Sequence, residues 1–290
     1  MPSGHHSAII VPSNGIPVCS QREMEEKPAT IGLEAARELA REKRLVLKAA
    51  EITALERGTV PQRYLRNIGT IGTEGQIRLL KSCVAVVGAG GLGGTIIELL
   101  ARMGVGKIII IDGDRFAEQN LNRQLMCTEK AIGKFKAKVA AARVRRINSA
   151  VTVTAITQRL TEENAVRLLK GAHVVLDGLD NLPSRLAVEK ACRELGVPFV
   201  HGSIAGFTGQ VMTVYPEDPG LRAIYGAMEE VPEAGIETRL GNPATTPAIV
   251  AAWQVQETIK IITGIGEPLR NRLVIIDVLG GSMHSIEVKR

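Results

Sequence analysis

A glycine-rich segment between a predicted strand and a predicted helix is the first feature of this sequence that could do chemistry. Residues 84–87 are Val-Ala-Val-Val and run into Gly-Ala-Gly-Gly-Leu-Gly, in which Gly88, Gly90 and Gly93 have the spacing G-x-G-x-x-G. Side chains there would block the tight turn and keep a phosphate away from the backbone N–H groups at the helix start. Asp112 ends the next predicted strand, about 20 residues further on, where a carboxylate can accept hydrogen bonds from ribose hydroxyls. These features predict a nucleotide site, and taken alone they favour an NAD-dependent oxidoreductase.

The polar stretch that begins at Asp112 points to a different reaction. Residues 112–124 lie just beyond a predicted strand end, which is the ligand-binding edge of an open αβ sheet. Attack of a carboxylate on an α-phosphate brings two negative groups together and releases pyrophosphate, so it needs more cationic side chains than hydride transfer does. Arg123 offers a planar fork for phosphate oxygens, Lys136 a point charge at a helix start, and Asp180 a carboxylate for Mg²⁺. Their alternative roles are a surface ion pair, a solvated helix start and a helix N-cap, respectively. In combination with the glycine loop, the three residues predict ATP-dependent adenylation.

A series of motifs makes the chain resemble the ThiF/MoeB/HesA family, relatives of the ubiquitin-activating enzymes. The resemblance covers about residues 62–280 and is specific, because several motifs agree in kind and spacing. In chain order the motifs are Arg63-Tyr64-x-Arg66, Gly75-Gln76, the glycine loop, Arg102-Met103-Gly104-Val105-Gly106, Asp112-x-Asp114, Asn120-Leu121-x-Arg123-Gln124, Ile132-Gly133-x-x-Lys136, Asp177-Gly178-x-Asp180-Asn181, Phe207-x-Gly209-Gln210 and Glu257-x-x-Lys260-x-x-Thr263-Gly264.

The resemblance implies an adenylyltransferase that binds ATP and Mg²⁺ and activates the Gly-Gly carboxyl end of a ubiquitin-like sulfur carrier protein. By this resemblance, Asp112 binds the ribose, Asp180 binds Mg²⁺, and Arg66 reaches into the site of a neighbouring subunit, which implies a homodimer. The catalytic set is Arg123, Lys136, Asp180 and Arg66. The implied nucleotide-binding set is Gly88, Gly90, Gly91, Gly93, Asp112, Asp114, Asn120, Arg123, Gln124, Lys136, Asp180 and Asn181.

The sequence departs from the family at its cysteines. Many members hold a structural zinc with two C-x-x-C pairs, but Gly-Leu-Arg-Ala at residues 220–223 takes the place of the first pair, so no zinc is expected. Residues 216–246, where some members carry a cysteine that forms a persulfide or thioester, contain none. We therefore expect the acyl-adenylate to be released or passed to a separate sulfur donor. Cys83 and Cys192 are expected in the core, and His201 either lines the channel for the carrier tail or is a buried, hydrogen-bonded histidine.

Alternating short β-branched runs and amphipathic stretches predict the fold that positions these residues. Strand, helix, strand at this spacing indicates right-handed βαβ units and a doubly wound, mostly parallel, Rossmann-like α/β sheet with added antiparallel strands. The strands are predicted at residues 83–87, 107–112, 151–156, 173–177, 199–203, 209–215, 273–277 and 285–288, and the helices at 93–103, 134–147, 162–169, 183–195 and 247–263. Three regions follow along the chain: a flexible segment (1–29), a helical extension (30–60) and the nucleotide-binding adenylation domain (61–290).

The overall composition narrows the class of protein and its partners. The 290 residues are 45% hydrophobic but only 3% aromatic, which suits buried parallel strands rich in Val, Ile and Leu. The net charge of +6 is spread along the chain with few aromatic residues, so nucleic acid is not the expected partner, although activation of a tRNA-borne carboxylate stays open. No C-x-x-C pair, signal peptide or membrane-length apolar run is present, so a cytoplasmic location is expected. A non-catalytic binder of a ubiquitin-like partner is a further alternative.

Overall fold

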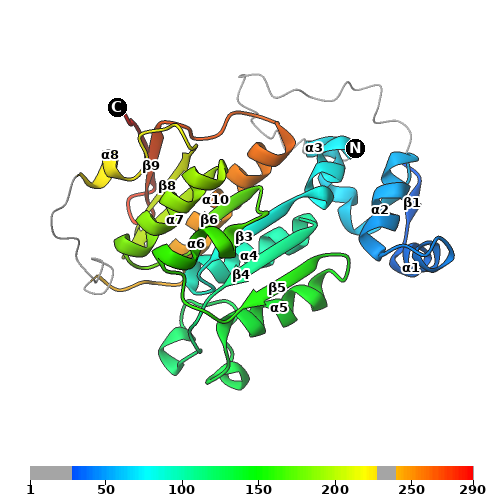
Figure 1. Cartoon of the computed structure of the whole chain (residues 1–290), viewed down its shortest axis with the longest axis horizontal. Coiled ribbons are helices and arrows are strands. Elements are labelled where there is room, and N and C mark those ends of the chain that lie inside the picture. The colour runs from blue at the N-terminus through cyan, green and yellow to red at the C-terminus, as the bar shows by residue number, and fades with distance from the viewer. Residues whose placement is uncertain (1–27, 227–239, 290) are drawn as a thin grey trace, which may run out of the picture.

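The core of the molecule is one twisted sheet of eight strands in the computed structural model, which describes residues 28–226 and 240–289 (Figure 1). The strand order is β10-β9-β8-β7-β6-β3-β4-β5, in which β5, β4, β3, β6 and β7 are parallel and β8, β9 and β10 extend the sheet antiparallel. The strands are β3 (Cys83–Val87), β4 (Lys107–Ile111), β5 (Thr152–Ile156), β6 (Val174–Asp177), β7 (Phe199–Ala205), β8 (Thr208–Val214), β9 (Arg272–Asp277) and β10 (Ser282–Glu287). The predicted doubly wound, mostly parallel sheet with added antiparallel strands is confirmed.

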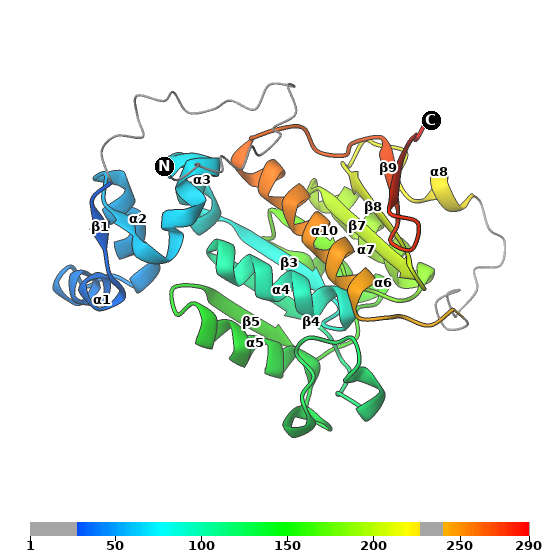
Figure 2. The ribbon, with the colours of Figure 1, turned by 180° about the vertical axis from the view of Figure 1, so that it is seen from behind.

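Helices cover both faces of the sheet, as the two opposite views show (Figures 1 and 2). One face carries α4 (Gly91–Met103), α5 (Lys136–Ile147) and α10 (Thr245–Thr263), and the other carries α6 (Glu162–Leu169) and α7 (Leu182–Leu195). The two faces follow from the alternation of side chains along each strand. In β3, Val84 and Val86 belong to the apolar cluster under α4 and α10, whereas Ala85 and Val87 belong to the cluster under α6 and α7.

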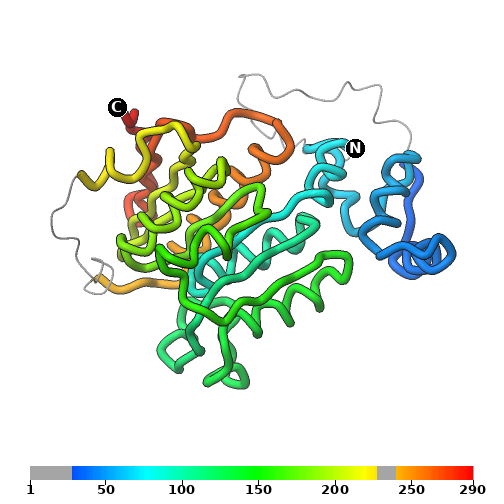
Figure 3. Tube along the Cα trace, viewed as in Figure 1, coloured from blue at the N-terminus to red at the C-terminus, as the bar shows by residue number. Residues whose placement is uncertain are grey.

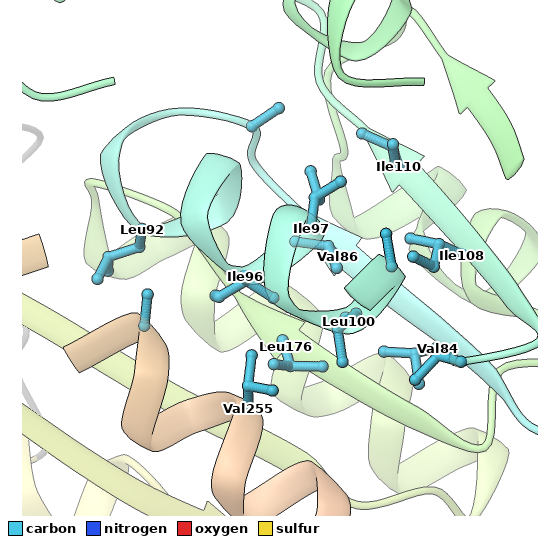
Figure 4. Close-up of a cluster of buried hydrophobic side chains, with 14 of the residues drawn as sticks. Val84, Val86, Leu92, Ile96, Ile97, Leu100, Ile108, Ile110, Leu176 and Val255 are labelled. Carbon is cyan, nitrogen blue, oxygen red and sulfur yellow. The ribbon is translucent and has the colours of Figure 1, made fainter. Parts of the chain in front are cut away.

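The larger cluster is built mainly from branched aliphatic side chains, with alanines where helices approach the sheet closely. Figure 4 shows strand residues Val84, Val86, Ile108, Ile110 and Leu176 meeting Leu92, Ile96, Ile97 and Leu100 of α4 and Val255 of α10. All of these side chains are buried. The scarcity of aromatic residues is thus compatible with a close-packed core, and the rigid base holds the first turn of α4 in place.

A smaller unit precedes the sheet and lies beyond the amino ends of β3 and β4 (Figure 3). It contains β1 (Thr30–Ile31), α1 (Leu33–Glu42), α2 (Leu47–Glu56), β2 (Val60–Pro61) and α3 (Leu65–Lys81). Tyr64 is fully buried here, donating a hydrogen bond to Glu51 and accepting one from Asn148. Helices were predicted for residues 30–57, but α3 was not, because its repeated glycines hide the apolar period; Gly72 kinks this helix with a φ of 68°. The segment predicted to be flexible, 1–29, lies outside the described residues except for 28 and 29.

The structure describes the region between β8 and α10 only in part. A short helix, α8 (Arg222–Tyr225), follows β8, and α10 begins at Thr245, two residues earlier than predicted. Residues 227–239 lie outside the described part of the chain. No helix within 28–226 or 240–289 is both long and apolar enough to cross a membrane.

Candidate functional site

The glycine loop forms the tight turn between β3 and α4 that its spacing predicts. Gly88 has a φ of +92°, and a Cβ added to it would lie 2.4 Å from the carbonyl oxygen of Gly178. A Cβ on Gly93 would lie 1.8 Å from the carbonyl oxygen of Gly88, so this glycine permits the close approach of helix and loop. Gly91 differs because nothing lies closer than 3.5 Å to its Cβ position, at the first residue of α4. The first and last glycines therefore shape the turn, while the middle of the loop leaves the helix N-terminus open to an anion.

Asp112 directly follows β4 and connects the end of this strand to the glycine loop by a hydrogen bond. One carboxylate oxygen accepts a hydrogen bond from the Ala89 N–H (2.7 Å), and the other accepts one from the Asp114 N–H (2.7 Å). Burial raises the pKa of the Asp112 carboxyl, and the two backbone hydrogen bonds oppose that rise. Asp112 thus holds the loop in shape, and lone pairs on its oxygens remain available to ribose hydroxyls.

A crevice of about 130 Å³ opens above these elements, at the carboxyl ends of β3, β4 and β6. This volume is below the roughly 300–1,000 Å³ of sites that enclose a whole ligand, so the crevice would hold only part of a nucleotide. Predicted site residues that line it are Gly88, Gly90, Gly91, Asp112, Asp114, Arg123, Gln124, Lys136 and Asp180. The structure therefore brings together residues that lie up to 92 positions apart in the chain, from Gly88 to Asp180.

The two predicted phosphate-binding cations enter the crevice from the segment between β4 and α5. Lys136 is the first residue of α5 and only 8% exposed, and its Nζ lies 3.3 Å from a carboxylate oxygen of Asp114. The alternative of a solvated helix start is therefore wrong. Arg123 is half-buried and donates to the Gln119 carbonyl (2.9 Å) and to the Asn122 side chain (2.8 Å), rather than to a surface carboxylate. Neither cation is held in a buried ion pair, so both can turn to a phosphate at small cost.

Asp180 follows β6 on the opposite wall of the crevice. Its side chain is exposed and accepts a hydrogen bond from Asn181 Nδ2 (3.1 Å). The N-cap of α7 is Asn181, whose Oδ1 accepts from the Ser184 N–H (2.9 Å), so the N-cap alternative for Asp180 is wrong. Mg²⁺ in nucleotide sites is commonly held by one or two carboxylates together with phosphate oxygens and water. The exposed carboxylate of Asp180 fits such an ion, although the described residues contain no group of three or more His, Cys, Asp or Glu that could hold a metal by themselves.

Four predicted residues do not line the crevice. Gly93 permits the close approach of α4 to the glycine loop, and Asn181 caps α7. Asn120 is buried, and its Oδ1 accepts a hydrogen bond from the Ala117 N–H (2.9 Å). Arg66 is exposed at the start of α3, close to Tyr64, which packs at the C-terminal end of α4. Since α4 has 13 residues and rises about 1.5 Å per residue, roughly 20 Å separates that end from the glycine loop. Within one chain Arg66 is thus remote from the crevice, and its predicted role requires a second subunit.

A buried ionic cluster behind the Asp180 wall was not predicted from the sequence. Asp177 is fully buried and accepts from His201 Nδ1 (2.7 Å) and the Leu179 N–H (2.8 Å), with Arg185 Nε 3.3 Å away. Arg185 also donates to the Leu179 carbonyl (2.7 Å) and lines the crevice. His201 is the buried, hydrogen-bonded histidine of the two alternatives, and burial lowers its pKa despite the neighbouring carboxylate. The cluster holds both the N–H and the carbonyl of Leu179 by hydrogen bonds. It therefore fixes the turn that carries Asp180. Arg185 could have been found from the sequence, because it is a cationic residue in the first turn of the helix that follows Asp180.

Comparison of the sequence with models of known protein families matches residues 64–290 to the ThiF family. The chain belongs to the ThiF family. This match covers both walls of the crevice and most of the chain, and it confirms the predicted family.

Curated relatives of this ThiF-family chain agree with that assignment. It is 37% identical over 229 residues to the SAMP-activating enzyme E1 of Haloferax volcanii, covering 77% of this chain and 84% of that protein. It is 38% identical over 242 residues to the sulfur carrier protein adenylyltransferase of Thermus thermophilus, covering 79% of this chain and 87% of that protein. The predicted enzyme class, an adenylyltransferase, is confirmed by these relatives.

A solved structure extends the similarity to the fold. The E. coli MccB structure with ATP superposes with a TM-score of 0.67 at 24% identity, over 79% of this chain and 72% of that one. At this identity the match supports the fold of the ThiF-family chain alone.

The described cysteines of the ThiF-family chain are buried in its core. Cys83, Cys127 and Cys192 are all free thiols, and burial raises the pKa of each. Such thiols are poor nucleophiles because little thiolate forms. Residues 220–223 take the place of the first zinc-binding cysteine pair. In this segment the Leu221 N–H donates a hydrogen bond to the Glu189 carboxylate (3.0 Å). Cys19 lies outside the described residues.

Proposed function

We propose that this ThiF-family enzyme uses ATP to adenylate the C-terminal Gly-Gly carboxylate of a ubiquitin-like sulfur carrier protein. The observation that carries the proposal is the convergence of Arg123, Lys136 and Asp180 on one crevice above the N-terminus of α4. A site with two movable cations and an exposed carboxylate matches a triphosphate with its metal better than it matches a nicotinamide ring. The relatives named as a SAMP-activating enzyme and as a sulfur carrier protein adenylyltransferase support the choice of substrate.

The chemistry follows from the charges that the crevice supplies. A carboxylate oxygen of the carrier attacks the α-phosphorus, the bond to the oxygen that bridges the α- and β-phosphates breaks, and pyrophosphate leaves with that oxygen. The N-terminus of α4 and the Arg123 guanidinium stabilise the charge that develops on the phosphate oxygens. Lys136 leaves Asp114 for the phosphates, which costs little because Asp114 is exposed. When bound, Mg²⁺ at Asp180 would neutralise the leaving pyrophosphate.

We further propose that the active unit is a homodimer in which Arg66 completes the crevice of the partner subunit. The support is the remoteness of Arg66 from the crevice of its own chain and its exposure at the start of α3. Because residues 216–246 contain no cysteine and the described thiols are buried, a separate protein would supply the sulfur. The cytoplasmic location remains a prediction.

ATP–pyrophosphate exchange tests the proposed reaction directly. The purified chain is incubated with ATP, Mg²⁺ and a panel of ubiquitin-like carriers that end in Gly-Gly, with tRNA and carrier-free reactions alongside. We expect exchange with at least one carrier and none without it. NAD binding without exchange would replace the proposal with an oxidoreductase, and carrier binding without exchange would indicate a non-catalytic binder.

A further inference from the structure

A second cavity, larger than the nucleotide crevice, lies against the other side of the same chain segment. It measures about 700 Å³ and is bounded by α5 and by residues 115–135, which project beyond the sheet near the bottom of Figure 1. We call it the basic pocket, because its lining contains six cations and no acidic residue: Arg115, Lys130, Lys134, Lys138, Arg143 and Arg146. The proposed adenylation does not use this cavity.

The cations of the basic pocket are only partly neutralised. Arg143 pairs with Glu98 (2.8 Å), and the Arg115 guanidinium lies 3.8 Å above the centre of the Phe135 ring. In contrast, Lys130, Lys134 and Arg146 are exposed and form no ion pair with any residue of 28–226 or 240–289. Several unpaired like charges around one hollow repel one another, and an anionic partner would relieve that repulsion.

The floor of the basic pocket is apolar, which narrows the class of partner. Met126 and Ala131 are buried there, and the Leu125 side chain is 54% exposed at the mouth. Nucleic acid favours long basic strips and aromatic side chains on which bases can stack. The pocket has one aromatic ring, Phe135, and Arg115 already covers a face of it. We propose that the basic pocket binds an acidic segment of a partner protein that inserts at least one large apolar side chain.

The basic pocket and the nucleotide crevice share a wall. The Phe116 N–H donates to the Lys134 carbonyl (3.0 Å), and the Lys136 N–H donates to the Asp114 carbonyl (2.9 Å). Phe135 is the N-cap residue of α5 and lines the basic pocket, while the next residue, Lys136, lines the crevice. A segment packed on Phe135 therefore acts on the position of Lys136. The effect on ATP use rests on the proposed function, whereas binding in the pocket does not.

Fluorescence anisotropy on the full chain tests the binding. The probe is a labelled synthetic peptide that alternates Glu with Leu and Phe, compared with an equally acidic peptide in which Ser replaces Leu and Phe, and with single-stranded RNA of equal charge. The test variant combines Lys130→Glu, Lys134→Glu and Arg146→Glu. The matched control combines Lys43→Glu, Arg57→Glu and Lys170→Glu, three exposed cations that do not line the pocket. Thermal melting and sedimentation establish that both variants fold and keep the oligomeric state of the parent.

The expected result is tighter binding of the apolar-acidic peptide than of the Ser peptide, and a loss of about tenfold or more in the test variant. The control variant should change the affinity less than about twofold. Equal losses in both variants, or equal binding of both peptides, would overturn the proposal, because attraction would then be general. Preferential RNA binding lost in the test variant would assign the surface to nucleic acid, and dissociation of the oligomer in that variant would assign it to an interface between copies.

ATP–pyrophosphate exchange, measured with and without the peptide, separates this proposal from the proposed function. If the peptide binds and shifts the KM for ATP in the parent but not in the test variant, the shared wall transmits the effect. If the peptide binds while no carrier supports exchange, the proposed function fails and the basic pocket stands.

Discussion

The two walls of the nucleotide crevice differ in how deeply their charged groups are buried. The wall from β3 to α5 carries Asp114, Arg123 and Lys136, whose contacts are at least partly exposed and can be exchanged. The wall from β6 to α7 rests on Asp177 and His201, which are fully buried and bonded to each other. Exposed ion pairs contribute little to stability, whereas removal of one partner from a buried pair is strongly destabilising. The comparison indicates that the first wall supplies charge for the reaction and the second supplies a fixed position for Asp180.

Removal of the buried carboxylate or of the exposed carboxylate of the second wall should have very different effects on stability. Asp177→Ala leaves Arg185 buried without its partner, so we expect a loss of about 3–5 kcal/mol in the free energy of unfolding. Asp180→Ala removes an exposed side chain from the same turn and should leave unfolding unchanged while raising the Mg²⁺ concentration required for exchange. Urea unfolding of both variants measures the contrast. Equal stability of the two would show that the buried cluster does not support the turn.

The first wall is tested by its most exposed cation. Arg123→Ala should lower ATP–pyrophosphate exchange by on the order of 10²–10³-fold, the effect of losing one donor to a developing charge, and should leave the melting temperature unchanged. Gln119→Ala, which keeps the carbonyl that Arg123 contacts, is the matched control. Exchange near the parent level in Arg123→Ala would remove this residue from the mechanism.

Two glycines of the first wall have different roles. Gly93 permits the tight turn, and Gly91 leaves the N-terminus of α4 open to the ligand. Gly93→Ala places a methyl group against the Gly88 carbonyl and should cost at least about 1–3 kcal/mol in stability. Gly91→Ala meets only ordinary contacts, so its melting temperature should hold, while its KM for ATP rises because the methyl group stands at the helix N-terminus. Differential scanning fluorimetry and exchange kinetics give the two readouts. The reverse pattern would contradict the assignment of Gly91 to ligand access.

The smallest expected effect concerns pH and the buried histidine. Burial lowers the pKa of His201, and Arg185 already balances the charge of Asp177, so the folded protein holds this imidazole neutral. As pH falls below the ordinary value near 6.5, the unfolded chain binds a proton that the folded chain does not, and stability is lost. Between pH 7 and 5.5 the parent should lose about 1 kcal/mol more than His201→Asn. An equal loss in both proteins would show that His201 is not neutral in the fold.

The sequence predicted the first wall well and the second wall poorly, for a physical reason. The predicted site residues from Gly88 to Lys136 follow β3 and β4 in one continuous β3-α4-β4-α5 stretch, so their spacing places them at the carboxyl ends of these strands, and the crevice contains most of them. The Asp177–His201 contact depends instead on the pairing of β6 with β7 and on the depth of both side chains, which spacing does not encode. The same limit applies to α3, whose burial by tertiary packing compensates for glycines that are unfavourable in a helix. In the eight-stranded sheet, each strand except β10 lay within two residues of its prediction, because buried β-branched runs mark such strands clearly; β10 began three residues earlier, and the short strands β1 and β2 were not predicted.

Mass spectrometry of the carrier after reaction detects the product of the proposed adenylation itself. A carrier that supports exchange is incubated with the enzyme, ATP, Mg²⁺ and pyrophosphatase, beside the same carrier with its C-terminal carboxylate converted to an amide. We expect one AMP to be added to the C-terminal glycine of the free-carboxylate carrier and none to the amide. AMP on the amide carrier or on the enzyme itself, or no AMP on either carrier, would contradict the proposed adenylation.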